Sequence, residues 1–200
     1  EKISKIGTQP IIGTQINFKI NDTTGLLPLF ALNEIGYKRI IELSSLSYLL
    51  NDRISDPHLN FQELLSRTEG VAIFTGTING LFGELFDKGK FTEIAELYAK
   101  LKSKYKDRFY IEIQRHGDQN EIAFEKFNLS QSLTLKIPLI ATNEVYYLNK
   151  DMSEAHDALI CIKNKTYINE KNRIKYTNQH YLKSNSEMFE LFADLPEALQ

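Results

Sequence analysis

The chain has 200 residues, a length that fits one ordinary domain or one large α/β unit. Its apolar content of 42% and charged content of 25% exclude a disordered chain and allow a sizeable buried core. The formal net charge of −2 excludes a general electrostatic attraction to nucleic acid or to an anionic membrane, so any nucleic-acid contact must be local.

The first part of the chain is predicted to form two strands and a helix. Residues 10–20 alternate between apolar and polar side chains, which is typical of a strand. After a polar turn, the apolar run 26–32 predicts a second, buried strand, in which Pro28 favours an edge position or a bulge. Asn33 is the expected N-cap of the next helix, and 51–60 resembles a loop. The apolar face of this helix is predicted to comprise Tyr37, Ile40, Ile41 and Leu43.

From residue 61 onward, helices and strands alternate regularly. Their order and spacing indicate βαβ units and a parallel sheet or barrel. The predicted elements are a helix over 61–66, a strand over 71–75, a short helix over 80–86, an amphipathic helix over 91–105, a strand over 109–114, a helix over 120–133 and a strand over 137–141.

The last of these strands stops abruptly at Thr142-Asn143-Glu144. In α/β folds, sites are built at the carboxyl ends of strands, so a site is expected at this edge. Beyond it, 153–162 is predicted to be a helix capped by Ser153, and 163–180 reads as polar and irregular. A short helix is expected over 186–192, and Pro196 is expected at the first position of another. The whole chain, 1–200, is interpreted as a single domain without repeats or linkers.

The residue content also indicates where the protein is found. No apolar run is long enough to span a membrane, and no basic leader precedes an apolar run, so neither a membrane contact nor secretion is expected. The single cysteine, Cys161, cannot form an internal disulfide and fits a reducing compartment, which predicts a cytoplasmic protein. Because the sequence begins at Glu1, without an initiator methionine, we expect this chain to be a piece of a longer protein.

No strong catalytic signature emerges from residue spacing alone. The four histidines form neither His-x-His nor His-x-x-x-His, and Cys161 has no partner at zinc spacing. The glycines after strand 71–75 lack the Lys-Ser/Thr of a phosphate-binding loop, and no Gly-x-Ser-x-Gly motif occurs.

Individual polar residues leave two interpretations open. His116 is either a ligand or general base at a strand end, or a loop histidine bonded to nearby backbone. Glu112, in the middle of a strand, is either a site residue or part of a buried polar layer, and in both cases it must be paired. His156 and Asp157 are interpreted as a structural or interface pair on a helix.

One basic cluster, with two tyrosines, is a candidate for contact with DNA phosphates. The alternative interpretation is a solvated charged face. The cluster comprises Lys163, Lys165, Lys171, Arg173 and Lys175.

Several strings, in this order, resemble a known family. They are Pro10-Ile11-Ile12-Gly13, Tyr110 to Gly117, Pro138 to Leu148, Ala155-His156-Asp157, Tyr181 to Met188 and Leu191 to Ala198. Together they are similar to the PHP (polymerase and histidinol phosphatase) domain of bacterial DNA polymerase III alpha subunits, over essentially the whole chain. The resemblance implies a distorted βα barrel with a multi-metal site at one mouth. It also implies that this barrel is incomplete, because the family's first strands and their His-x-His motif would precede Glu1.

The resemblance places the family's metal ligands on residues that are mostly poor donors. The family's Glu falls on Gln15, its next His near Leu26, and its Cys on Thr77. The Asp and His of its Thr-Asn-Asp-Val-His motif fall on Glu144 and Tyr146. Only Glu144 keeps a hard anionic donor, so the resemblance implies a degenerate site without a metal ion.

The resemblance implies a structural and partner-docking module of a replicative DNA polymerase, with no catalytic residue of its own. Its partners would be other replicase subunits, the proofreading exonuclease subunit above all. DNA synthesis, with its Mg²⁺ site, would belong to another part of the full protein. The rival hypothesis is an active metal-dependent phosphoesterase or 3′–5′ exonuclease that uses Glu112, His116, Glu144 and His156. A third is a DNA-binding module whose affinity depends on Lys171 and Arg173.

Overall fold

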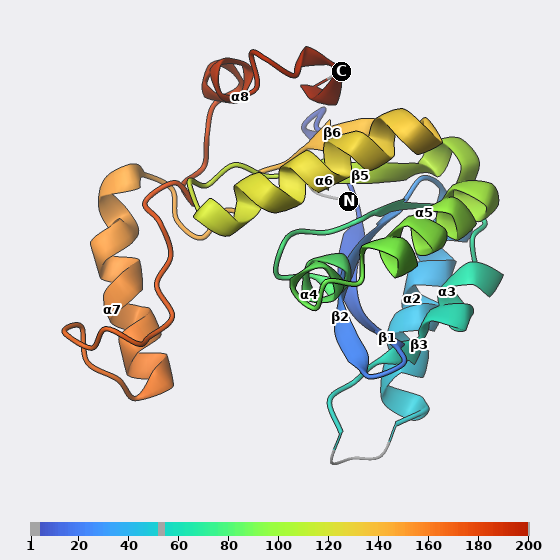
Figure 1. Cartoon of the computed structure of the whole chain (residues 1–200), viewed down its shortest axis with the longest axis horizontal. Coiled ribbons are helices and arrows are strands. Elements are labelled where there is room, and N and C mark those ends of the chain that lie inside the picture. Colours follow the sequence, from blue (N-terminus) through green and yellow to red (C-terminus); the bar gives the residue numbers. More distant parts are fainter. Residues whose placement is uncertain (1–4, 52–54, 200) are drawn as a thin grey trace. The chain divides into compact units, whose positions relative to one another are not determined.

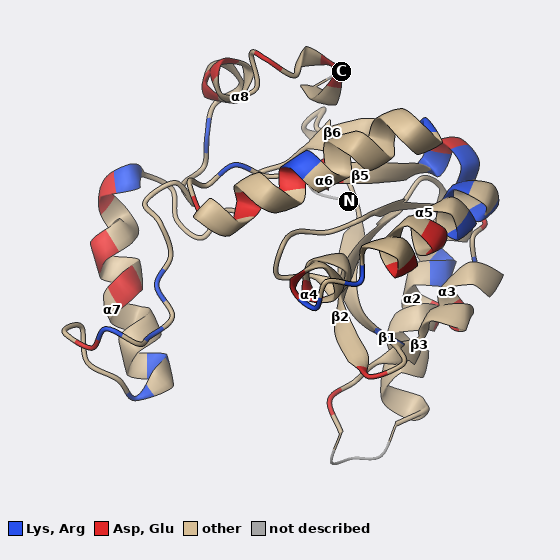
Figure 2. Ribbon diagram, in the orientation of Figure 1, with Lys and Arg blue, Asp and Glu red and all other residues tan. Residues whose placement is uncertain are grey.

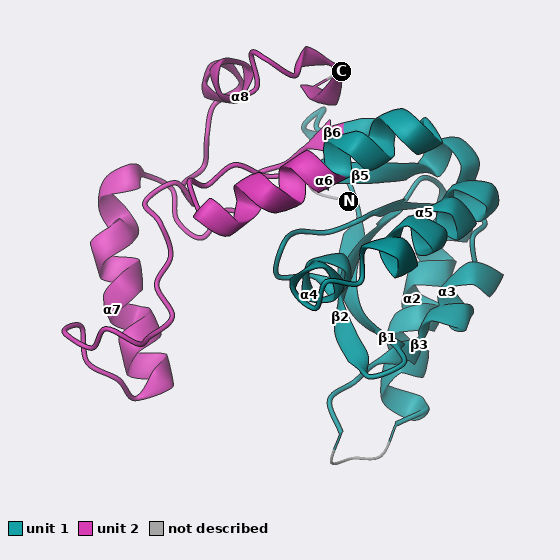
Figure 3. Ribbon diagram, viewed as in Figure 1, with its two compact units in different colours: residues 1–112, 128–139 teal, residues 113–127, 140–200 magenta. Residues whose placement is uncertain are grey.

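A computed structural model describes residues 5–51 and 55–199, and it divides into two compact units (Figures 1 and 3). Unit 1 consists of residues 1–112 and 128–139, and unit 2 of 113–127 and 140–200. The single-domain organisation over 1–200 stays a prediction. The expected loop over 51–60 includes 52–54, which lie outside the described residues.

The predicted α/β class is confirmed, with an open sheet of six strands in the order β3-β1-β2-β4-β5-β6. The strands are β1 (Gly13–Ile20), β2 (Thr23–Ala31), β3 (Leu59–Asn60), β4 (Val71–Phe74), β5 (Phe109–Ile113) and β6 (Leu139–Ala141). The division into units falls within β5 and β6, so both units contain part of these strands.

The expected parallel pairing is found between β4 and β5, and the first strands pair differently. β4 and β5 are parallel, as the βαβ pattern predicted, but β1 pairs antiparallel with β2, and β2 with β4. The predicted parallel arrangement concerned the strands from residue 61 onward and agrees with the β4–β5 pairing, whereas the pairing direction of β1 and β2 was not predicted. Only Asn21 and Asp22 separate β1 from β2, with Asn21 at a left-handed φ of 50°, and so short a turn can join only antiparallel neighbours.

The prediction that Pro28 marks an edge strand or bulge is also wrong, because β2 lies between β1 and β4. Pro28 is opposite Gln15 in the pairing with β1. Pairing with β4 begins only at Leu29, so the missing N–H of Pro28 removes no bond from that side.

The helices of unit 1 follow the sequence pattern closely. Asn33 caps α2 (Glu34–Leu49), its Oδ1 accepting from the Gly36 N–H at 3.0 Å. Of the predicted apolar face, Ile40 and Leu43 are buried, whereas Tyr37 and Ile41 are 43% and 48% exposed. The other helices are α3 (Phe61–Ser66), α4 (Leu81–Asp87) and α5 (Phe91–Tyr105), followed by the 3₁₀ turn η1 (Lys106–Arg108).

The largest fully buried side chains in the core of unit 1 are aromatic. The phenol of Tyr98 donates to Asn128 Oδ1 at 3.0 Å, and that of Tyr105 donates to the Leu64 carbonyl at 3.0 Å. These bonds satisfy hydroxyl groups that burial would otherwise make costly. The fully buried residues of this core include Phe18, Leu27, Leu29, Ile73, Phe82, Tyr98, Leu101, Tyr105 and Phe109.

Unit 2 contains most of the later elements. Helix α6 (Gln119–Leu135) begins in unit 2 and ends in unit 1. The 3₁₀ turn η2 (Lys150–Met152) leads directly into α7 (Ser153–Asn164), so Met152 is the N-cap and the predicted cap role of Ser153 is wrong. Helix α8 (Asn185–Leu191) starts with a capping box of Ser184 and Glu187, and η3 (Pro196–Leu199) follows.

Within the described residues, none of the helices is both long and apolar enough to cross a membrane.

Candidate functional site

The loop after β6 lies at the expected site edge, and in unit 2 it is fixed mainly by hydrogen bonds. The Thr142 N–H donates to the Ile113 carbonyl at 3.1 Å, which continues the pairing beside β5. Asn143 Nδ2 donates to the Tyr181 carbonyl at 2.8 Å, and the Tyr146 N–H donates to the His180 carbonyl at 2.9 Å. This loop and the segment 177–182 therefore hold each other in place.

His116 is buried in this edge, with 2% of its surface exposed. Its Nδ1 donates to a carboxylate oxygen of Glu121 at 2.8 Å. Its Nε2 lies 3.2 Å from the Glu144 N–H and 3.1 Å from Asn143 Oδ1. The neutral ring accepts from the former, and a protonated ring donates to the latter. Burial raises the pKa of Glu121, but its bonds from His116 outweigh that effect and the pKa is lowered.

His180 stacks on His116, with ring centroids 4.0 Å apart and planes within 4°. Its Nδ1 donates to the Glu144 carbonyl at 3.1 Å. Burial, together with the neighbouring His116, lowers the pKa of His180, so the neutral ring is favoured. Sequence reasoning missed His180, which is 64 residues from His116 and forms no spacing motif with it.

Four further rings extend this stack into a histidine–tyrosine cluster. Tyr146 stacks on His156 of α7, with centroids 5.1 Å apart and planes 12° apart. Tyr176 contacts Tyr146 at 4.7 Å and His180 at 5.3 Å. The cluster comprises His116, Tyr146, Tyr147, His156, Tyr176 and His180.

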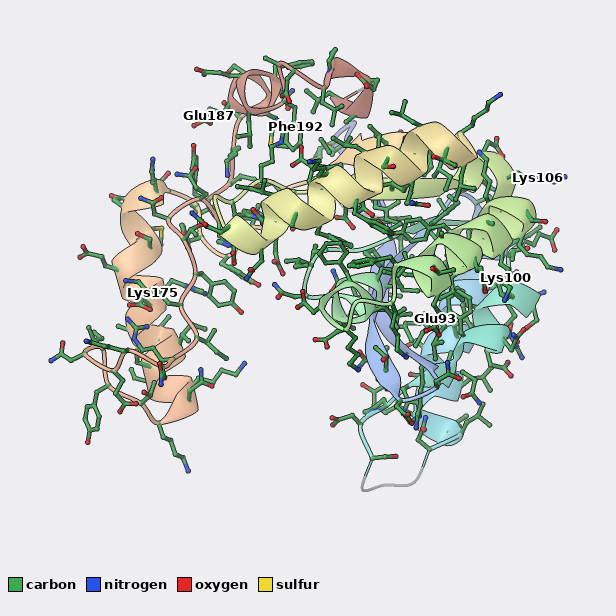
Figure 4. The ribbon with its side chains drawn as sticks, in the orientation of Figure 1. Glu93, Lys100, Lys106, Lys175, Glu187 and Phe192 are labelled. Atoms are coloured by element: carbon green, nitrogen blue, oxygen red, sulfur yellow. The ribbon has the colours of Figure 1, made fainter. Side chains whose placement is uncertain are left out.

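The basic cluster beyond α7 is not uniform. The guanidinium of Arg173 forms two bonds with the Asp157 carboxylate, at 2.5 and 2.7 Å, and its side chain is only 6% exposed. This pair raises the pKa of Arg173 and lowers that of Asp157. The lysines at 163, 165, 171 and 175 are exposed, and Figure 4 labels Lys175, which lies in the irregular segment after α7.

The other predicted positions lie in unit 1. Gln15 is exposed on β1, and the side chain of Leu26 is 38% exposed on β2. The backbone carbonyls of Leu26 and Thr77 both lie close to Gly80. A Cβ added at Gly80 would be 2.9 Å from the Leu26 oxygen and 3.2 Å from the Thr77 oxygen. Glu112 is buried in β5, and its N–H donates to Thr75 Oγ1 at 2.9 Å.

The structure thus brings together His116, Glu144, Tyr146 and His156 in unit 2, while Gln15, Leu26, Thr77 and Glu112 belong to unit 1. In the parts of the chain that are described, no three His, Cys, Asp or Glu side chains are arranged to hold a metal ion.

Comparison with known families assigns the class of this α/β chain. The PHP domain model matches residues 1–116, more than half of the chain, and the chain therefore belongs to the PHP domain family.

The chain is also similar to individual proteins, which are more specific than the family. The chain is 38% identical over 98% of its length to DNA polymerase III subunit alpha of Rickettsia conorii. It is 35% identical over 96% of its length to the subunit alpha of Caulobacter vibrioides, and 33% identical over 100% to that of Borreliella burgdorferi. The chain spans only 17% or 18% of the length of these relatives.

Proposed function

We propose that this chain is the PHP-domain part of a bacterial DNA polymerase III alpha subunit, acting in chromosome replication in the cytoplasm. The support is the similarity to several such subunits along nearly the whole chain. Within that enzyme, this part is a structural and partner-docking module without catalytic activity of its own.

The observation that carries the second half of the proposal is the packing of Tyr146. At the position of the family's histidine ligand, its ring stacks on His156 and contacts Tyr176 and His180. Burial, with the nearby Glu144 carboxylate, raises the pKa of Tyr146 well above its ordinary value. The phenol therefore stays protonated at neutral pH, and a protonated phenol is a poor metal ligand.

The remaining donors support the same conclusion. Gln15 offers a neutral carbonyl, Leu26 has no donor atom, and the Thr77 hydroxyl is weak. One carboxylate, Glu144, does not offset the cost of desolvating a multiply charged metal cluster. The residues at these positions therefore do not fit the family's metal site.

The rival function is a metal-dependent phosphoesterase or 3′–5′ exonuclease. It is tested by measuring hydrolysis of a single-stranded DNA 3′ end and of a phosphate monoester by the chain and by the full-length subunit, with added Mn²⁺ or Zn²⁺. The metal content of both proteins is measured in parallel. We expect no stoichiometric metal and no hydrolysis above the level without protein.

Glu144→Gln is the decisive variant, and Glu154→Gln, at an exposed position of α7, is its matched control. Activity that is abolished by Glu144→Gln but kept by Glu154→Gln would establish the hydrolase and refute the inactive module.

Docking of the proofreading exonuclease subunit is measured with the purified alpha and exonuclease subunits by calorimetry. Saturable binding is expected, and deletion of this chain from the alpha subunit should abolish it. Binding that survives the deletion would place the contact elsewhere in the polymerase.

A further inference from the structure

One side of helix α7 is packed against other residues of unit 2. Asp157 pairs with Arg173, and Cys161, one turn later, is only 4% exposed. The Cys161 carbonyl accepts from the Thr166 N–H at 3.0 Å, which fixes the start of the returning segment. The segment 166–176 therefore covers this side of the helix.

The opposite side of α7 is apolar and exposed. Leu159 and Ile162 are 63% and 74% exposed, Ala155 one turn before Leu159 is exposed, and the N-cap residue Met152, just before the helix, is 42% exposed. Their spacing of three, four and three residues follows one stripe of an α-helix, which we call the α7 stripe. At about 100° per residue, Leu159 is roughly opposite Asp157, so the α7 stripe and the covered side face away from each other.

Charge is distributed unevenly along α7. Glu154 and Asp157 lie in its first half, 158–162 carry no charge, and Lys163 lies in its last turn (Figure 2). Lys165 follows at the C-cap in a left-handed conformation, and both lysines are exposed. Of the two acidic residues, Asp157 is neutralised by its pair with Arg173, whereas Glu154 is exposed. The apolar end of the α7 stripe is therefore flanked by positive charge.

We propose that the α7 stripe is the docking face for an acidic amphipathic helix of a partner protein. Apolar residues at alternating three- and four-residue spacing form the seam of paired helices, which is why the occupant is a helix. Lys163 lies beside this seam, where opposite charges on the partner set specificity, which is why the helix is acidic. Aliphatic side chains offer no surface for base stacking, so a protein is favoured over single-stranded nucleic acid.

This inference rests on the docking part of the proposed function and gives it a surface and a partner class. The probe is a fluorescent 21-residue peptide designed as an amphipathic helix. Its leucines recur at alternating three- and four-residue spacing, with glutamates at the flanking positions. The like charges of the glutamates oppose pairing between peptides. Binding of the probe to the 200-residue chain is measured by anisotropy. A peptide with lysines in place of the glutamates and a single-stranded oligonucleotide are measured alongside.

We expect saturable binding of the acidic peptide, and loss of at least about tenfold in affinity in the double variant Leu159→Lys, Ile162→Lys. Leu133→Lys is the matched control, because this α6 side chain is also exposed, at 82%, and lies off the stripe. It should bind like the unchanged chain. Circular dichroism of each variant checks the fold, which substitutions at exposed positions should preserve.

Equal binding by the double variant and the unchanged chain would overturn the proposal, as would tighter binding of the oligonucleotide. Peptide binding to the chain but not to the full-length alpha subunit would assign the stripe to another part of the same polypeptide and also refute a partner helix. A dimer that the double variant abolishes would assign it to a second copy. None of these results affects the metal and hydrolysis tests, so the two proposals fail separately.

Discussion

Arg115 connects three parts of unit 2, and its removal should be costly. Its guanidinium pairs with Glu125 of α6 at 2.5 Å and with Asp194 at 2.6 Å, and donates to the Leu191 carbonyl at 2.8 Å. It also lies over the ring of Phe192, 4.7 Å from the centroid. Phe192 is fully buried and lies at the end of α8, where Figure 4 labels it. Its bonds to the two carboxylates raise the pKa of Arg115, so it is always charged.

The change Arg115→Met keeps most of the side-chain volume and removes the charge. Glu125, with a side chain 16% exposed, loses its partner, which we put at about 2 kcal/mol because the pair is not fully buried. The lost bond to the Leu191 carbonyl adds about 1 kcal/mol. Asp194 is 69% exposed, so its pair adds little. We expect the free energy of unfolding to fall by about 3 kcal/mol.

The assay is urea unfolding followed by far-ultraviolet circular dichroism, with hydrogen exchange of 185–195 as a local measurement. The control is Lys38→Met, which removes an ion pair with Glu34 whose side chains are 71% and 79% exposed, and it should cost under about 0.5 kcal/mol. A loss below about 1 kcal/mol for Arg115→Met, without faster exchange in 185–195, would refute the view that this arginine holds the C-terminal segment.

Two further predictions concern a close backbone contact and a buried histidine. Gly36→Ala should lower the free energy of unfolding by about 3 kcal/mol or prevent folding, because the added Cβ would lie 1.8 Å from the Gly70 carbonyl oxygen. An unchanged midpoint of urea unfolding would show that this backbone contact can open. Burial and the neighbouring His116 lower the pKa of His180 in the folded chain below 6.5. The unfolded chain therefore binds this proton more tightly than the folded chain does. Stability is lost as the pH falls from 6.5 through the folded pKa. His180→Gln should therefore flatten the loss of stability between about pH 7 and 5 in thermal melts, while Glu144 and His116 remain; an identical slope would contradict the assignment.

Local patterns predicted most elements because each rests on neighbouring residues. The amphipathic spacing of 91–105 gave α5 with its observed bounds, and Asn33 gave the start of α2. The antiparallel pairing of β1, β2 and β4 depends on contacts between distant residues, which periodicity does not report. The two-residue turn at Asn21 was the one local signal for it. The cap at Ser153 was missed because a 3₁₀ turn precedes α7.

The candidate site shows the same limit more sharply. The end of the predicted strand at Thr142 located the loop, and Glu121 is only five residues beyond the histidine that it contacts. His180 and Tyr176 reach the cluster from a segment with no regular secondary structure, which no spacing rule places. The His116 ring bonds both to the Glu121 carboxylate and to the backbone N–H of Glu144, so both interpretations of this residue stay predictions.

The geometry around Tyr146 explains how such an edge can serve as a scaffold. A hydrolytic site needs donor groups that face solvent and substrate, whereas this loop directs its rings onto His156 and Tyr176. The same contacts, with the Asp157–Arg173 pair, attach α7 to the rest of unit 2 and leave the α7 stripe exposed. A histidine at 146 would be smaller and would titrate near neutral pH, so it would hold α7 less firmly. On the proposed function, the tyrosine therefore exchanges a metal ligand for the rigidity that a docking helix requires.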